Sequence, residues 1–255
     1  MSSTTMKGAQ TATKWADAIF AKEGSRLTLG GEPTYVPENP EGAEWSYSAV
    51  GPTKLSYARR MAEELLKTRM TGGAVFFSPG KQYPGEVNPR WALRMLARRD
   101  GQPIFRGRAS NRRTEEPQAL VFLQSLPGRL GLRAEWMAFT DPRAEAVKSW
   151  VLPLDHDDSG WSSAEWKIKA GERMLLATEG PAGLRLPLHL LPPEVPRRAL
   201  VAELVEGRLC IFFPPLLQGA FTELLAAIGE SLAAAKIGLY EMQGYVPEDT
   251  DKVWT

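Results

Sequence analysis

The chain has 255 residues, of which 43 % are hydrophobic, so it can bury a core as one large domain or two small ones. Lys and Arg number 31 against 30 Asp and Glu, and the net charge of +1 gives no overall field that would attract nucleic acid or a membrane surface. No apolar run reaches the roughly 18 residues that a membrane-spanning helix needs.

The cysteine and histidine content limits the possible chemistry. The single cysteine, Cys210, excludes internal disulfides and favours a reducing, cytoplasmic location. Because the chain contains only one cysteine and two histidines, His156 and His189, a zinc site is not expected. Any metal should be Mg²⁺ or Mn²⁺ held by carboxylates. Residues 1–12 contain no apolar signal segment and are expected to form a flexible tail.

The first part of the chain alternates between predicted helices and short strands. Apolar periodicity predicts helices over 13–22 and 53–68. Strands are expected over 26–29, where Gly30-Gly31 makes a turn, and over 74–77. Asn88-Pro89 is typical of a helix start, so a helix is predicted from there to Gly101, and another over 114–125.

The second part is richer in strands, which are predicted over 134–139, 147–152, 174–177, 200–204, 209–213 and 239–242. Glu206-Gly207 indicates a hairpin turn, and residues 222–236 indicate a helix that ends at Gly238. This mixed order, without regular βαβ alternation, predicts an α+β fold with a mainly antiparallel sheet and packed helices. The polar stretch 155–163 is expected to be a loop near a boundary that divides the chain into 13–154 and 155–255.

Glu32 is the first candidate site residue, because a predicted strand delivers its carboxylate just beyond two glycines. The backbone can approach a ligand closely there, and carboxylates at strand ends suit Mg²⁺. The alternative is a Gly-Gly turn with a solvated glutamate.

The loop 80–91 places Lys81 and Arg90 before a predicted helix N-terminus. These cations could neutralise phosphates, although the spacing of a Walker A loop is absent. The alternative is a rigid structural loop with its charges in water.

Arg185 lies between apolar neighbours and needs a partner if it is buried, either a protein carboxylate or a substrate phosphate or carboxylate. Eight arginines between residues 90 and 113 face one acid, Asp100. Few aromatics interleave with them, so a solvated surface followed by a mobile loop is preferred over nucleic-acid binding. No Gly-x-Ser-x-Gly elbow is present, and Cys210 in an apolar strand indicates a buried thiol rather than a nucleophile.

Several segments together resemble the amidoligase domain linked to bacterial transglutaminase-like proteins. They are Leu-Thr-Leu-Gly-Gly-Glu-Pro-Thr (27–34), Gly-Ala-Glu-Trp (42–45), Gly-Pro-Thr-Lys (51–54), Gly-Lys-Gln-Tyr-Pro-Gly-Glu (80–86), Pro-Arg-Trp-Ala-Leu (89–93), Arg-Arg-Asp-Gly-Gln-Pro-Ile (98–104) and Gly-Leu-Arg-Leu-Pro-Leu (183–188). The resemblance implies the carboxylate–amine ligase fold of glutamine synthetase and glutamate–cysteine ligase. It also implies an ATP- and Mg²⁺-dependent reaction that joins a carboxylate to an amine, on a small-molecule or peptide substrate.

The resemblance further implies that Glu32 and Glu241 are metal ligands, and that Lys81, Arg90 and Arg185 contact phosphate or substrate. The sequence departs from the family at Gln243, where the family carries a glutamate before Gly-Tyr; the nearest acid is Glu241. The family also continues with further Glu-bearing strands. We therefore expect a fragment, a chain completed by a partner, or a non-catalytic binding or structural module, with no nucleic-acid or membrane partner.

Overall fold

The protein is described by a computed structural model that covers residues 51–80, 90–105, 110–144, 146–247 and 253–254, with positions 14, 18–19, 22, 41–42, 44 and 84. The chain divides into two compact units, residues 1–42 and 43–255. In the first unit residues 14, 18–19 and 22 are helical, as predicted for 13–22. The predicted strand over 26–29, Glu32 and Lys81 lie outside the described residues, and the division after residue 154 stays a prediction.

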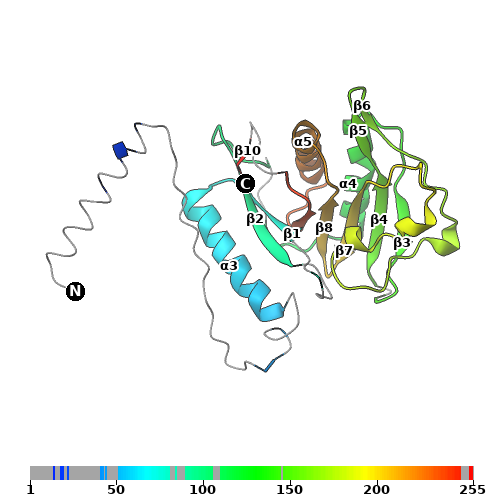
Figure 1. Ribbon diagram of the computed structural model, residues 1–255, viewed down its shortest axis with the longest axis horizontal. Coiled ribbons are helices and arrows are strands. Elements are labelled where there is room, and N and C mark those ends of the chain that lie inside the picture. Colours follow the sequence, from blue (N-terminus) through cyan, green and yellow to red (C-terminus); the bar gives the residue numbers. More distant parts are fainter. Residues whose placement is uncertain are drawn as a thin grey trace. The chain divides into compact units, whose positions relative to one another are not determined.

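Eight strands of the second unit form one mixed sheet in the order β10-β2-β1-β9-β8-β7-β4-β3 (Figure 1). The strands are β1 (Ala74–Pro79), β2 (Trp91–Arg98), β3 (Met137–Thr140), β4 (Lys148–Pro153), β7 (Ala199–Val205), β8 (Arg208–Phe213), β9 (Tyr240–Gly244) and β10 (Val253–Trp254). β9 runs parallel to both of its neighbours, β1 and β8, whereas the other pairs are antiparallel. The predicted α+β fold with a mainly antiparallel sheet is confirmed.

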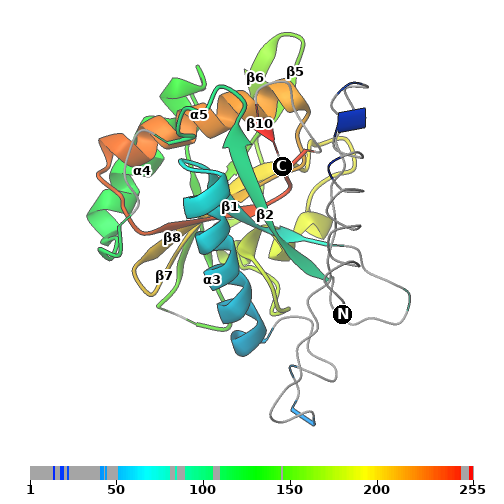
Figure 2. The ribbon, with the colours of Figure 1, turned by 90° about the vertical axis from the view of Figure 1, so that its left-hand side faces the viewer.

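Two helices, α4 (Glu116–Arg129) and α5 (Gln218–Ala234), lie side by side over one face of the sheet (Figure 2). α4 begins with a capping box, in which the side chains of Glu115 and Gln118 accept hydrogen bonds from each other's backbone N–H groups. The main core fills the space between the helices and the sheet. Its fully buried members include Phe76, Leu96, Leu200, Ile211 and Phe213 from strands and Phe122, Leu126, Phe221, Leu224 and Ile228 from helices.

The opposite face of the sheet is covered in two places. At the β3–β4–β7 end, the segment 164–195 contributes three 3₁₀ helices, η1 (Ala170–Glu172), η2 (Ala182–Arg185) and η3 (Leu188–Leu190). It packs a second core on strand residues such as Val151, Val201 and Phe212. At the other end lies α3 (Pro52–Arg69), the helix predicted over 53–68, with Ala62 as its buried residue. The sheet between α3 and η2 is where a site can form.

The helix predicted from Asn88 to Gly101 is wrong, because residues 91–98 form strand β2. Ala, Leu, Met and Arg favour a helix locally, but six residues of β2 pair with the six residues of β1, and two pair with β10. Of the arginines expected to face solvent, Arg98 is exposed. Arg94 is half-buried, and its Nη1 donates to the carbonyl oxygen of Val246 at 3.1 Å.

Two further expectations need correction. The stretch 155–163 is a small hairpin of β5 (Asp155–Asp157) and β6 (Gly160–Ser162), rather than a loop. The strand predicted over 174–177 is reduced to one isolated bridge between Thr140 and Met174. By contrast, the hairpin turn at Glu206-Gly207 is confirmed, with φ values of 49° and 75° that suit a two-residue turn. No helix among the described residues combines the length and apolarity that crossing a membrane would require.

Candidate functional site

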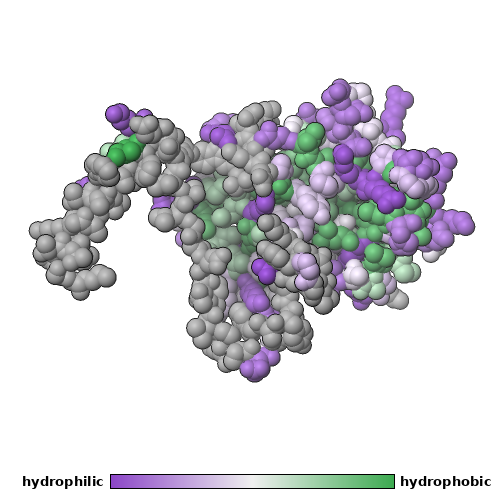
Figure 3. Space-filling model, viewed as in Figure 1, coloured by the Kyte–Doolittle hydropathy of each residue, from purple (hydrophilic) through white to green (hydrophobic). Residues whose placement is uncertain are grey.

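A pocket of about 460 Å³ lies on the sheet face opposite α4 and α5, between α3 and η2. Its floor comes from β1, β2, β7, β8 and β9, and its walls include Leu55 of α3 and Leu184 of η2. Side chains alternate across a strand, so while Phe76 and Met242 face the helices, Phe77 and Glu241 face the pocket. Figure 3 shows hydrophobic residues in the region of α3, with hydrophilic residues beside them.

Two arginines from distant parts of the chain meet at one carboxylate in this pocket. Arg59 of α3 donates through Nη2 to Oε2 of Glu241 on β9, and Arg208 of β8 donates through Nη1 to the same oxygen at 3.2 Å. The other oxygen, Oε1, accepts a hydrogen bond from Nε2 of Gln243 at 2.8 Å. The Glu241 side chain is 15 % exposed, against 38 % for each arginine. Two guanidinium groups and one carboxylate leave this cluster with an excess positive charge.

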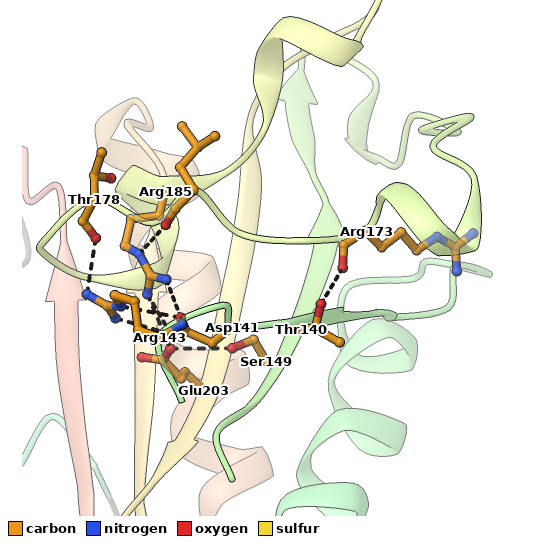
Figure 4. A network of polar contacts seen from close by, with 9 residues as sticks. Thr140, Asp141, Arg143, Ser149, Arg173, Thr178, Arg185 and Glu203 are labelled. Carbon is orange, nitrogen blue, oxygen red and sulfur yellow. Dashed lines mark hydrogen bonds and ion pairs between the residues drawn. The ribbon is translucent and has the colours of Figure 1, made fainter. Parts of the chain in front are cut away.

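Arg185, the last residue of η2, forms a buried ion pair with Asp141 from the β3–β4 loop (Figure 4). Nη1 and Nη2 of Arg185 donate to Oδ2 and Oδ1 of Asp141 at 2.8 and 2.6 Å, while Nε donates to the carbonyl oxygen of Leu176 at 2.9 Å. These bonds, with further ones from Arg143, hold the pKa of Asp141 well below its usual range despite burial. Of the two alternatives for Arg185, the structure shows the protein carboxylate.

Glu203 on β7 lines the pocket and also borders this ion pair. Its residue exposure is 8 %, its Oε1 accepts a hydrogen bond from Oγ of Ser149 at 3.3 Å, and the same oxygen lies 4.0 Å from Nη1 of Arg185. Burial raises the pKa of the Glu203 carboxyl above its usual value, although the positive charge of Arg185 opposes that shift. Two of the carboxyl groups that line the pocket therefore lie in different environments, Glu241 beside two arginines and Glu203 poorly solvated.

Cys210 lies between these two acids, because it pairs with Glu203 on one side and with Glu241 on the other. The thiol is buried, and burial together with the nearby carboxylates raises its pKa. The predicted burial of the thiol is confirmed, and since the thiolate is the reactive form, this environment disfavours its reactivity.

The predicted site residues separate into three groups. Glu241 and Arg90 line the pocket, whereas Arg185 is 0 % exposed and does not line it. Glu32 and Lys81 lie outside the described residues. Sequence reasoning missed Arg59, Arg208 and Glu203. One signal was available for Glu203, a lone acid within the apolar strand 199–205, because such an acid needs a partner or a ligand.

The described residues do not by themselves fit a Mg²⁺ site. Among them, no group of three or more His, Cys, Asp and Glu side chains is arranged to hold a metal ion. Both oxygens of Glu241 already accept hydrogen bonds, and two arginines repel a cation there. Mg²⁺ needs about six oxygen ligands, so further ligands would have to come from residues outside this set.

Comparison with known proteins identifies the family. Residues 3–148 match the sequence model of a family described as "Putative amidoligase enzyme". The matched region includes Arg59 and Arg90 of the pocket, whereas Glu203, Arg208 and Glu241 follow it. No curated protein matches the chain, and no solved structure does. Because the matched region is more than half of the chain, this protein belongs to the amidoligase family so described.

Proposed function

We propose that the pocket between α3 and η2 binds the carboxylate of a small-molecule or peptide substrate as part of an ATP-dependent amidoligase site. The observation that carries this proposal is the convergence of Arg59 and Arg208 on a single carboxylate oxygen of Glu241. Arginine binds carboxylates and phosphates through several donors, and a single partner oxygen leaves N–H groups of both arginines for a second anion.

The apolar lining of the pocket strengthens such binding. Leu55, Phe77 and Leu184 lie around the charged cluster and limit the water that would screen it. Phe77 and Trp91, which stack with ring centroids 5.8 Å apart, add aromatic side chains to the floor. A carboxylate with an apolar body matches this lining.

The proposed reaction transfers the γ-phosphoryl group of ATP to the bound carboxylate oxygen, which gives an acyl phosphate and ADP. The nitrogen of a neutral primary amine then forms the C–N bond, phosphate leaves, and the nitrogen loses one proton and keeps the other as the amide N–H. Positioned cations contribute most to phosphoryl transfer, and Arg59, Arg90 and Arg208 are the candidates within the pocket. Four parts of this proposal are drawn from the sequence alone. They are the use of ATP, a Mg²⁺ ion held by Glu32 and Glu241, phosphate contacts from Lys81, and the cytoplasmic location.

The second candidate function is a non-catalytic module that keeps the anion pocket and binds ligands without turnover. Glu241 is surrounded by Arg59, Arg208 and Gln243, all of which donate hydrogen bonds to it. These contacts favour the non-catalytic module over a metal centre built from Glu241 alone.

The test combines binding and turnover. Isothermal titration calorimetry with a panel of carboxylates should give binding that weakens about tenfold or more in Arg208→Gln, since a charge-assisted hydrogen bond is lost. Arg129→Gln is the matched control, because Arg129 pairs with Glu230 on α5, over the other sheet face. Absence of carboxylate binding by the wild-type chain would refute the proposal.

ADP release with Mg²⁺, carboxylates and amines then separates the two candidates. Turnover that is lost in Arg208→Gln identifies a complete ligase. Carboxylate binding without ADP release identifies either one part of a larger site or the non-catalytic module. If the wild-type chain also binds ATP, and the same carboxylates compete with that binding, the result favours one part of a larger site.

A further inference from the structure

We propose that Glu203 is a second, oppositely charged subsite in the same pocket, which binds the primary ammonium group of a ligand whose carboxylate lies at Arg59 and Arg208. The inference rests on the proposed carboxylate site and names its substrate class: a compound that carries both charges, such as a short peptide.

Most positive and negative charges of the pocket come from different elements, except at the β7–β8 turn, where Glu206 lies two residues before Arg208. The arginines come from α3, from the start of β8 and from the residue before β2. The acids other than Glu241 come from β7 and its turn and from the segment before η2, namely Glu203, Glu206 and Glu179. A ligand with one kind of charge would meet attraction at one side and repulsion at the other, whereas a dipolar ligand is attracted by both.

Strand register sets the distance between the two subsites. Glu203, Cys210 and Glu241 form one row across β7, β8 and β9, through the pairs Glu203–Cys210 and Cys210–Glu241. Neighbouring strands lie about 4.8 Å apart, so the backbones that carry the two glutamates are separated by roughly 9.6 Å. An α-amino acid carries its ammonium and carboxylate on one carbon. The wider separation matches a short peptide, whose terminal charges are several bonds apart.

The Glu203 carboxyl is only partly satisfied by the protein. Oε1 accepts a hydrogen bond from Ser149, but both Nη atoms of Arg185 donate to Asp141, and Arg185 approaches Glu203 no closer than 4.0 Å. Oε2 of Glu203 makes no hydrogen bond to any other described residue. A buried acid in this state is unfavourable alone, and a ligand ammonium group would supply the missing donors and the opposite charge.

The experiment measures dissociation constants of three related peptides by calorimetry at pH 8. Alanyl-alanine carries both charges, N-acetyl-alanyl-alanine lacks the ammonium group, and alanyl-alanine amide lacks the carboxylate. Wild-type protein should bind alanyl-alanine about tenfold or more tightly than either derivative, because each derivative loses one charge-assisted contact. Glu203→Gln should remove the preference over the N-acetyl peptide while leaving the affinity for that peptide unchanged.

Two controls accompany this variant. Glu230→Gln removes an acid on the helix side of the sheet and should keep the wild-type preference. Ser149→Ala leaves the Glu203 carboxyl in place and should also keep the wild-type preference for the free peptide. Equal affinity of wild-type protein for the free and N-acetylated peptides would overturn the ammonium subsite but leave the carboxylate site standing. Absence of binding by all three peptides and by the carboxylate panel would overturn both.

Discussion

Asp141 and Arg185 form a bidentate ion pair whose side chains are 1 % and 0 % exposed. The pair joins the β3–β4 loop to η2, the element that walls one side of the pocket. Arg185 is therefore best understood as a residue that positions η2 and neutralises a buried acid.

Asp141→Asn should destabilise the protein by about 3–5 kcal/mol, because it leaves the guanidinium of Arg185 buried without a counter-charge. Chemical denaturation followed by circular dichroism measures the change. Asp100→Asn is the matched control, since Asp100 pairs with Arg98 at an exposed position, and a much smaller loss of stability is expected there. Similar losses in both variants would contradict the assignment of a buried, structural pair.

Glu203→Gln should make the free protein more stable at alkaline pH, with the gain shrinking as the pH falls. Burial raises the pKa of Glu203 in the folded state, so its contribution to stability is complete at acid pH and declines as the pH rises through that pKa. Because glutamine cannot ionise, the variant does not lose stability in this way as the pH rises. Arg185, Asp141 and Arg143 act on the same carboxyl, and the unfolding free energies of both proteins should be compared from acid to alkaline pH. A stability difference that does not change with pH would contradict this prediction.

Glu241→Gln should tighten binding of carboxylate ligands about three- to tenfold, because Arg59 and Arg208 would lose their internal counter-ion. Calorimetry without added metal measures this effect. Weaker carboxylate binding would instead mean that Glu241 contacts the ligand directly. Loss of Mg²⁺-dependent nucleotide binding in the same variant would support the proposed metal role of Glu241, and unchanged nucleotide binding would exclude it.

Gly183→Ala should destabilise the protein by about 1–3 kcal/mol and weaken ligand binding, because an added Cβ would lie 1.9 Å from Cδ1 of Phe212. Relief of that clash must move η2 away from β8 and widen the pocket. Gly128→Ala in α4 is the control, since its Cβ meets no atom within 4 Å and alanine favours a helix. Thermal denaturation should therefore show shifts of opposite sign, and a neutral Gly183→Ala would contradict the close approach.

Local signals in the sequence determined several elements of this protein. The apolar stripe from Leu55 to Leu66 predicted α3, and Thr114 to Pro117 predicted the start of α4. Glu206-Gly207 predicted the β7–β8 hairpin, because the conformation of a two-residue turn between apolar runs depends mainly on the two turn residues themselves. Family resemblance, carried by ordered motifs, agreed with the family match over residues 3–148.

Tertiary structure decided the rest. Residues 91–98 have helix-forming side chains, yet pairing with β1 makes them a strand. The stabilisation from this pairing depends on a partner strand that lies outside the segment itself. Arg185 needed a partner on sequence grounds, but only the fold brings Asp141 to it from 44 residues away. The pocket depends on still longer range, since Arg59 and Glu241 meet across 182 residues of chain. Charge clusters of this kind arise from sheet order, and sheet order is set by long-range pairing and burial that no local pattern encodes.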